Sequence, residues 1–69
     1  MKLRDLPQGS SIRVSTDDGP KLAVFDHLDG AYSRCHLAAD SSQVFHLGHA
    51  TPMRRGDDGV YAVKDDRSN

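Results

Sequence analysis

The side chains best suited to chemistry in this 69-residue chain are its four histidines and its single cysteine. They are His27, Cys35, His36, His46 and His49. A zinc site needs three or four such ligands that converge with tetrahedral geometry. In an extended strand Cys35 and His36 point to opposite sides, because successive side chains alternate, and His46 and His49 diverge in the same way. The spacing therefore predicts ordinary polar strand residues, and we expect no bound metal.

Nucleophilic or cofactor-dependent catalysis also finds no support in the sequence. Cys35 is expected between the apolar side chains of Val24 and Leu37, and apolar surroundings raise the pKa of a thiol and make it unreactive. The paired acidic residues lack the ordered ligand spacing of a calcium loop and are typical of solvated turns. These pairs are Asp17-Asp18, Asp57-Asp58 and Asp65-Asp66. We expect a protein that is not an enzyme and that binds no cofactor.

Composition narrows the class of protein further. The net charge is -1, which gives no strong field toward nucleic acid or a membrane surface. All ten acidic residues are Asp, a residue that favours turns over helix interiors. No apolar run is long enough for a secretory signal or a membrane span, and a lone cysteine fits a reducing compartment. Because the chain also begins with Met1, we expect a complete cytoplasmic protein with no membrane partner.

Turn residues at close spacing divide the chain into five predicted strands. They are Ser11–Thr16, Lys21–Leu28, Ala31–Ala38, Gln43–Ala50 and Val60–Lys64. This pattern predicts an all-β fold, a small five-stranded SH3-like barrel that is predominantly antiparallel. Residues 1–10 are then an N-terminal lead-in, residues 11–64 a single barrel domain and residues 65–69 a polar tail. Side-chain alternation outside the central hairpin assigns the following residues to the core: Ile12, Val14, Phe45, Leu47, Tyr61 and Val63.

The Asp29-Gly30 pair predicts a two-residue type I′ turn between the second and third strands. In that register Leu28 lies opposite Ala31, and directly paired residues share one face of the sheet. The apolar face then holds Leu22, Val24, Leu28, Ala31, Cys35 and Leu37. The outer face then holds Ala23, Phe25, His27, Tyr32, Arg34 and His36. Asp26 falls on the apolar side as a misfit, and a bulge or a longer loop would exchange the two faces locally.

The aromatic and basic side chains of this region predict a binding surface, because they can stack, donate hydrogen bonds or carry positive charge. The surface comprises Phe25, His27, Tyr32, Arg34, His36 and His46, together with Arg54 and Arg55 if their loop lies nearby. The same side chains can also serve only to stabilise an exposed sheet face through cross-strand pairs.

Three kinds of partner fit such a surface. The near-neutral charge favours a protein partner, since non-specific affinity for nucleic acid depends on many phosphate contacts. RNA or single-stranded DNA is the alternative, with rings that hold bases and cations that follow phosphates. In a third interpretation the patch, or an exposed edge strand, makes a homo-oligomer, because a core this small favours added burial. The sequence therefore predicts a small binding or accessory protein.

Several turns along the chain resemble those of the small SH3-like barrels. They are the early turn Leu6-Pro7-Gln8-Gly9, the Asp29-Gly30 hairpin and the Thr51-Pro52 break before a last short strand. The stretch Phe25-Asp26 followed by His49-Ala50-Thr51-Pro52 is similar to the bacterial Sm-like RNA chaperone. The chain lacks the acidic, aromatic-rich loop of signalling SH3 domains, and the N-terminal helix and glycine-bearing strand of the Sm-like chaperone. The resemblance spans about Leu6–Lys64, and both families imply a binding role.

Overall fold

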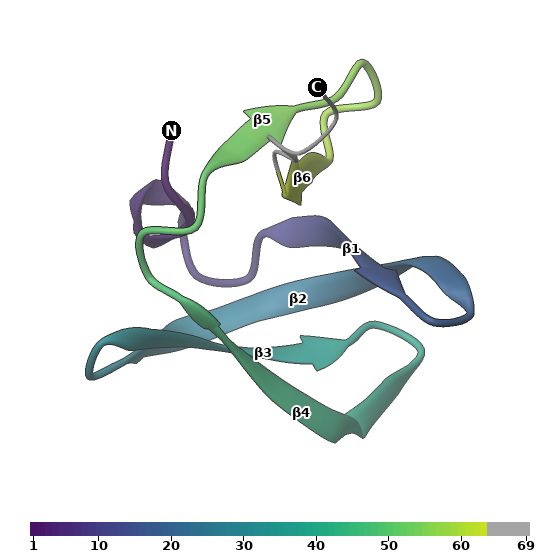
Figure 1. The fold of residues 1–69 in the computed structure, drawn as a ribbon, viewed down its shortest axis with the longest axis horizontal. Coiled ribbons are helices and arrows are strands. Elements are labelled where there is room, and N and C mark those ends of the chain that lie inside the picture. Colours follow the sequence, from purple (N-terminus) through teal and green to yellow (C-terminus); the bar gives the residue numbers. More distant parts are fainter. Residues whose placement is uncertain (64–69) are drawn as a thin grey trace.

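The computed structural model describes residues 1–63, which form one mixed sheet of six strands preceded by a turn of 3-10 helix (Figure 1). The elements are η1 (Leu3–Asp5), β1 (Ser11–Thr16), β2 (Gly19–Asp29), β3 (Tyr32–Leu37), β4 (Asp40–Gly48), β5 (Met53–Arg55) and β6 (Tyr61–Val63). The strand order is β4-β3-β2-β1-β6-β5, and all neighbours are antiparallel except β1 and β6. The prediction of an all-β, mostly antiparallel fold is confirmed.

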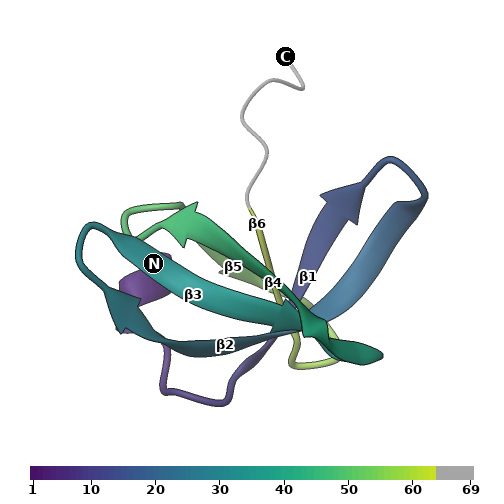
Figure 2. The same cartoon turned by 90° about the horizontal axis from the view of Figure 1, so that it is seen from below.

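The sheet bends strongly (Figure 2), but its strand order leaves β4 and β5 as two edges. Across residues 1–63 no ladder joins these edges, so the structure shows no closure into the expected barrel. All five expected strands are present, the first with the predicted ends and the other four with shifted ends, while Lys64 and the expected tail 65–69 lie outside the described residues. The three-residue β5 is a sixth strand that the sequence pattern does not predict. No helix in the described part of the chain has the length and apolarity to cross a membrane.

The β2–β3 turn lies one residue further along the chain than the sequence predicts. Asp29 pairs with Tyr32, so the central residues are Gly30 and Ala31. Gly30 has a φ of +63°, and no residue other than glycine has positive φ among those described. A type I′ turn needs positive φ at both central positions, so this turn is of the kind that places glycine first, as type II′ does. Near the turn each residue of β2 pairs with a residue two positions later than expected, such as Leu28 with Ser33 in place of Ala31. Because side chains alternate every residue, a change of two positions keeps each side chain on its expected face.

A β-bulge at Asp26 then exchanges the two faces of the earlier part of β2. The register runs from Phe25 opposite Cys35 directly to His27 opposite Arg34, which leaves Asp26 as an extra residue. One extra residue turns the side chains beyond it to the other face of the sheet. The expectation that Phe25 lies on the outer face is therefore wrong, since only 2% of its surface is exposed. Ala23, also expected outside, is fully buried.

The expected apolar face of the hairpin is correct for β3 and largely wrong for β2. Cys35 is buried and Leu37 packs against the core, as predicted. The side chains of Leu22, Leu28 and Ala31 are exposed instead, and Val24, which pairs with His36, lies on the opposite face from Cys35. Leu28 keeps the core side of the sheet, opposite the buried Ser33, but lies too near the turn to be covered.

The core is a single cluster of buried apolar residues. It comprises Leu3, Leu6, Ile12, Val14, Ala23, Phe25, Cys35 and Met53. The half-buried residues that pack against this cluster are Leu37, Phe45, Leu47, Tyr61 and Val63. All six residues assigned to the core outside the hairpin are thus confirmed as part of it or packed on it.

The N-terminal lead-in supplies two core residues that sequence reasoning did not assign there, Leu3 and Leu6. Three backbone hydrogen bonds tie this segment to the chain before and within β5. Leu3 N–H donates to Thr51 O at 2.9 Å, Arg4 N–H to His49 O at 3.0 Å, and Met53 N–H to Met1 O at 2.8 Å. The lead-in therefore packs as part of the folded unit, beside the segment that connects β4 to β5 (Figure 1).

Candidate binding surface

The surface of β2, β3 and β4 that faces away from the core brings together most of the polar residues noted in the sequence. The register places Arg34 opposite His46 and His36 opposite Val44, and paired residues share a face. Tyr32 lies on the same side of β3, since side chains two apart point the same way. We call this surface the outer face. It comprises Val24, Asp26, His27, Asp29, Tyr32, Arg34, His36, Val44 and His46.

Asp26 lies at the centre of the outer face, where the bulge turns it toward two basic side chains. Arg34 Nη1 donates a hydrogen bond of 2.7 Å to Asp26 Oδ2. His36 Nδ1 lies 2.8 Å from Oδ1 and 2.9 Å from Oδ2 of the same carboxylate. The hydrogen bond with His36 holds the pKa of Asp26 below its ordinary value of 3.8, against the opposing effect of burial, and the positive charge of Arg34 adds to this lowering. Asp26 is thus an ionised carboxylate that holds Arg34 and His36 in place.

Sequence reasoning missed this cluster because it assigned Asp26 to the apolar side. The signal in the sequence is that an acidic residue, Asp26, interrupts the apolar positions that alternate along this strand. By simple alternation Asp26 would point into the core, while Arg34 and His36 of the neighbouring strand point outward. One extra residue in β2 at this point turns the carboxylate outward, toward these two basic side chains. The pairing then satisfies an acidic side chain that would otherwise be buried without a partner.

The outer face combines exposed apolar surface with charges that are already paired. Arg34 is bound to Asp26, and His46 Nε2 lies 3.6 Å from Asp29 Oδ2. Tyr32 and Val44 lie on either side of the row formed by Arg34 and His46. Tyr32 exposes 56% of its surface and Val44 exposes 41%. The arrangement can bury a ring and a branched side chain against another molecule, while the paired charges between them form hydrogen bonds with it.

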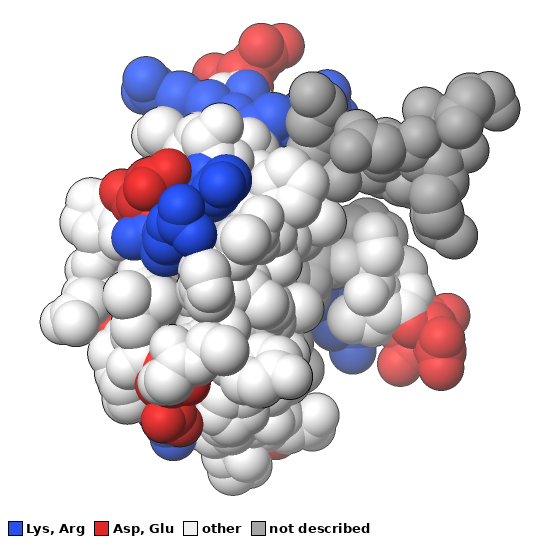
Figure 3. Space-filling model, turned by 60° about the vertical axis from the view of Figure 1, so that its left-hand side comes forward, with Lys and Arg blue, Asp and Glu red and all other residues white. Residues whose placement is uncertain are grey.

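Three of the residues predicted for the binding surface lie elsewhere. Phe25 is in the core. Arg54 and Arg55 are exposed on β5, which within residues 1–63 forms a ladder only with β6 and lies at the far end of the strand order from β4. On the side of the molecule drawn in Figure 3, Lys and Arg atoms lie beside Asp atoms and form no large patch of one sign. The structure therefore brings five predicted residues together: His27, Tyr32, Arg34, His36 and His46.

The histidines and the cysteine are not grouped in the described part of the chain. No group of three His, Cys or Asp side chains among residues 1–63 could hold a metal ion. Burial, and to a smaller degree the negative charge of Asp26, raises the pKa of the Cys35 thiol to about 11. Since the thiolate is the nucleophilic form, Cys35 is a poor nucleophile at neutral pH, as the sequence predicts.

Comparisons with known proteins assign no role to any of these residues. No family model, no curated protein and no solved structure matches the chain.

Proposed function

We propose that the protein is a non-enzymatic binding protein that engages a protein partner through its outer face. The observation that supports this most is that two exposed side chains on neighbouring strands, Tyr32 and Val44, lie on either side of residues held in fixed ion pairs. Tyrosine and arginine are enriched at the centres of protein interfaces, where an aromatic anchor is surrounded by polar groups. Asp26 holds Arg34 in advance, so less side-chain entropy is lost on binding.

The outer face suits a protein better than a nucleic acid for two reasons. The carboxylate of Asp26 neutralises Arg34, which leaves less free positive charge to follow a phosphate backbone. Burial of Phe25 also leaves Tyr32 as the one phenylalanine or tyrosine of this surface, whereas single-stranded nucleic acid is held by successive bases stacked on such rings.

The first prediction is that Tyr32→Ala abolishes capture of the partner. The tagged protein would be used to recover proteins from an extract of its native host, with identification by mass spectrometry. We expect recovery of a specific protein to fall by about tenfold or more in Tyr32→Ala, as for an interface anchor. The matched control is Leu28→Ala on the same hairpin, because Leu28 is 49% exposed but lies on the opposite side of the sheet.

Equal recovery of the partner by the Tyr32 and Leu28 variants would argue against the outer face. A parallel titration with fluorescent RNA and single-stranded DNA, at low and moderate salt, tests the alternative partner. Tight oligonucleotide binding that Tyr32→Ala removes would replace the protein partner with a nucleic acid.

A further inference from the structure

The two edges of the sheet differ in how well they are protected from pairing with another strand. β5 is three residues long, follows Pro52 directly and carries Arg54 and Arg55. Short length, proline and positive charge are the features that protect sheet edges. β4 has nine residues without Lys, Arg or Pro, and within residues 1–63 it pairs only with β3. Its ladder is interrupted at residues 41–43, so the regular and unprotected part of this edge is 44–48.

The backbone of β4 presents its free hydrogen-bonding groups at alternate residues. His49 N–H donates to Ala31 O at 3.2 Å, in the same register that pairs Leu47 with Ser33. Hydrogen-bonded and non-bonded pairs alternate along an antiparallel ladder. Phe45 and Leu47 thus bond to β3, whereas Val44 and His46 direct their N–H and C=O groups away from it. These outward groups can pair with one more strand.

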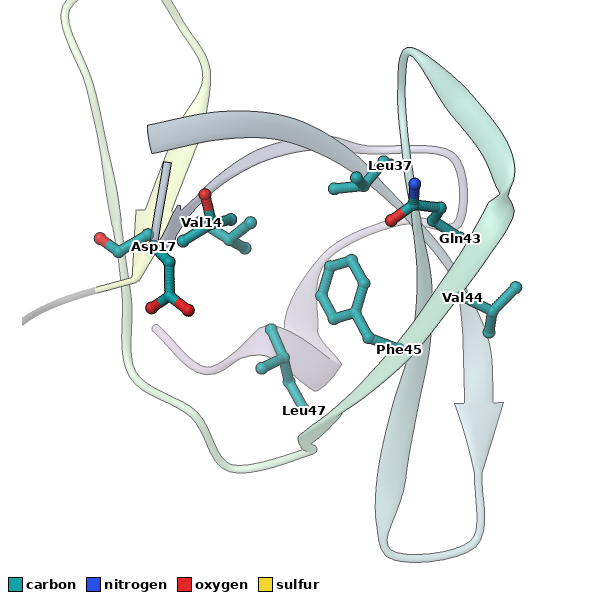
Figure 4. Close-up of a pocket in the computed structure, with 9 residues that line it drawn as sticks. Val14, Asp17, Leu37, Gln43, Val44, Phe45 and Leu47 are labelled. Atoms are coloured by element: carbon teal, nitrogen blue, oxygen red, sulfur yellow. The ribbon is translucent and has the colours of Figure 1, made fainter. Parts of the chain in front are cut away.

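A groove of about 450 Å³ runs beside the same strand, between β4 and the end of β1. Figure 4 shows Phe45 and Leu47 of β4 on the groove side, with Leu37 and Val14 also lining it and Val44 pointing away. Among the described residues that line the groove, Asp17 alone carries a charge. The groove is thus lined mainly by apolar side chains, with Ser15, Thr16 and Gln43 as uncharged polar residues and Asp17 as the acidic residue at the β1–β2 turn.

We propose that β4 accepts an extended segment of a partner protein as an added strand. This inference rests on the proposed function, and it names the shape and chemistry of the partner. The main chain of the segment pairs with Val44 and His46, and its alternate side chains enter the groove beside Phe45 and Leu47. Addition of a strand to an exposed edge gives affinity through the main chain and specificity through alternate pockets. Because Asp17 faces the groove, the segment has alternating apolar residues and a Lys or Arg at the position near this carboxylate.

The second prediction concerns peptides selected for binding. A random library of peptides of about ten residues, displayed on phage, would be selected on the immobilised protein, and the most enriched sequence would be synthesised. We expect apolar residues at alternate positions and a basic residue toward one end. Added peptide should slow amide hydrogen exchange at Val44 and His46, whereas the amides of Phe45 and Leu47, already bonded to β3, serve as internal references.

Two variants of one position isolate the backbone contribution. His46→Ala removes the side chain and keeps the outward N–H, whereas His46→Pro removes both and leaves the bonds to β3 intact. We expect His46→Pro to bind the synthetic peptide about tenfold more weakly than His46→Ala, and Asp17→Asn to weaken binding by roughly two- to fivefold. If His46→Pro does not fold, methylation of successive peptide nitrogens provides the same test, with loss of affinity expected at alternate positions.

Three results would overturn the inference. One is that the library enriches no sequence. Another is that the selected peptide binds without protecting the amides of Val44 and His46 from exchange. The third is that these amides become protected at high protein concentration without peptide, which would assign the edge to a second copy of the chain. A peptide that protects no β4 amide but loses affinity in Tyr32→Ala would reject the added strand and keep the outer face as the binding surface. The proposed function itself is tested separately, by how much partner protein the Tyr32→Ala and Leu28→Ala variants recover.

Discussion

Asp26 shows how one residue sets the chemistry of a surface. It is the extra residue of the β2 bulge, and its carboxylate contacts both Arg34 and His36. Without the bulge the side chain would point toward the core, where an unpaired carboxylate is costly. With the bulge, Phe25 enters the core and Asp26 organises the outer face. The same local irregularity therefore completes the packing and fixes the candidate binding residues.

The third prediction is that Asp26→Asn destabilises the protein by about 1–2 kcal/mol at neutral pH, because it removes a charge that accepts hydrogen bonds from two basic groups. The native pKa of Asp26 lies below the ordinary 3.8. Its stabilising contribution is therefore fully present above that value and is lost as the pH falls through the native pKa. Urea unfolding at several pH values should show the wild type and Asp26→Asn converging in acid. A difference that stays constant with pH would contradict this role for the ionised carboxylate.

At the level of elements, the sequence predicts where strands begin and end better than how they pair. Proline, glycine and aspartate mark the turns by local chemistry, and these turn residues separated the five expected strands correctly. Register depends on single-residue details. The turn uses Gly30-Ala31 in place of Asp29-Gly30, and the bulge at Asp26 reverses the faces of Ala23 and Phe25. The positions of the turn and the bulge depend on which arrangement of the whole sheet buries more apolar surface, and a local sequence pattern does not contain that information.

The short elements escaped prediction for a related reason. β5 has three residues and no alternation long enough to recognise, and η1 is a single turn. Both are fixed by tertiary contacts, since β5 pairs with β6 and the η1 backbone bonds to the segment before β5. The groove depends on the bend of the sheet, which brings β1 and β4 close together without a hydrogen-bonded pairing.

The fourth prediction tests the revised β2–β3 turn. Gly30 has positive φ and open space where the methyl group of an alanine would lie, so Gly30→Ala meets no clash and its cost is conformational alone. We expect a loss of about 1 kcal/mol in the free energy of unfolding. Gly48→Ala is the control, because Gly48 lacks positive φ and an added methyl would lie 3.7 Å from Thr51 Oγ1, an ordinary contact. Chemical denaturation of the two variants measures the difference, and equal stability would reject the positive-φ turn.

On the scale of the whole molecule, the N-terminal segment joins two parts of the sheet that are distant in strand order. Leu3 and Leu6 pack in one cluster with Phe25 of β2 and Met53 of β5. The backbone bonds from Leu3, Arg4 and Met53 hold the β4–β5 connection against this segment. In a domain of this size the apolar core leaves only a small margin of stability, so two leucines outside the strands supply a substantial part of it.

The fifth prediction is therefore that Leu3→Ala costs about 2–5 kcal/mol, as for a fully buried leucine of a central strand. Leu3 has 0% of its surface exposed, while Leu28, the control, is 49% exposed and should cost no more than about 0.5 kcal/mol when changed to alanine. Urea midpoints of the two variants separate these values. If both variants lost the same small amount, the N-terminal segment would be only loosely attached to the sheet. A large loss in Leu3→Ala alone would show that the six strands depend on a segment outside the sheet to hold their bend, and with it the groove beside β4.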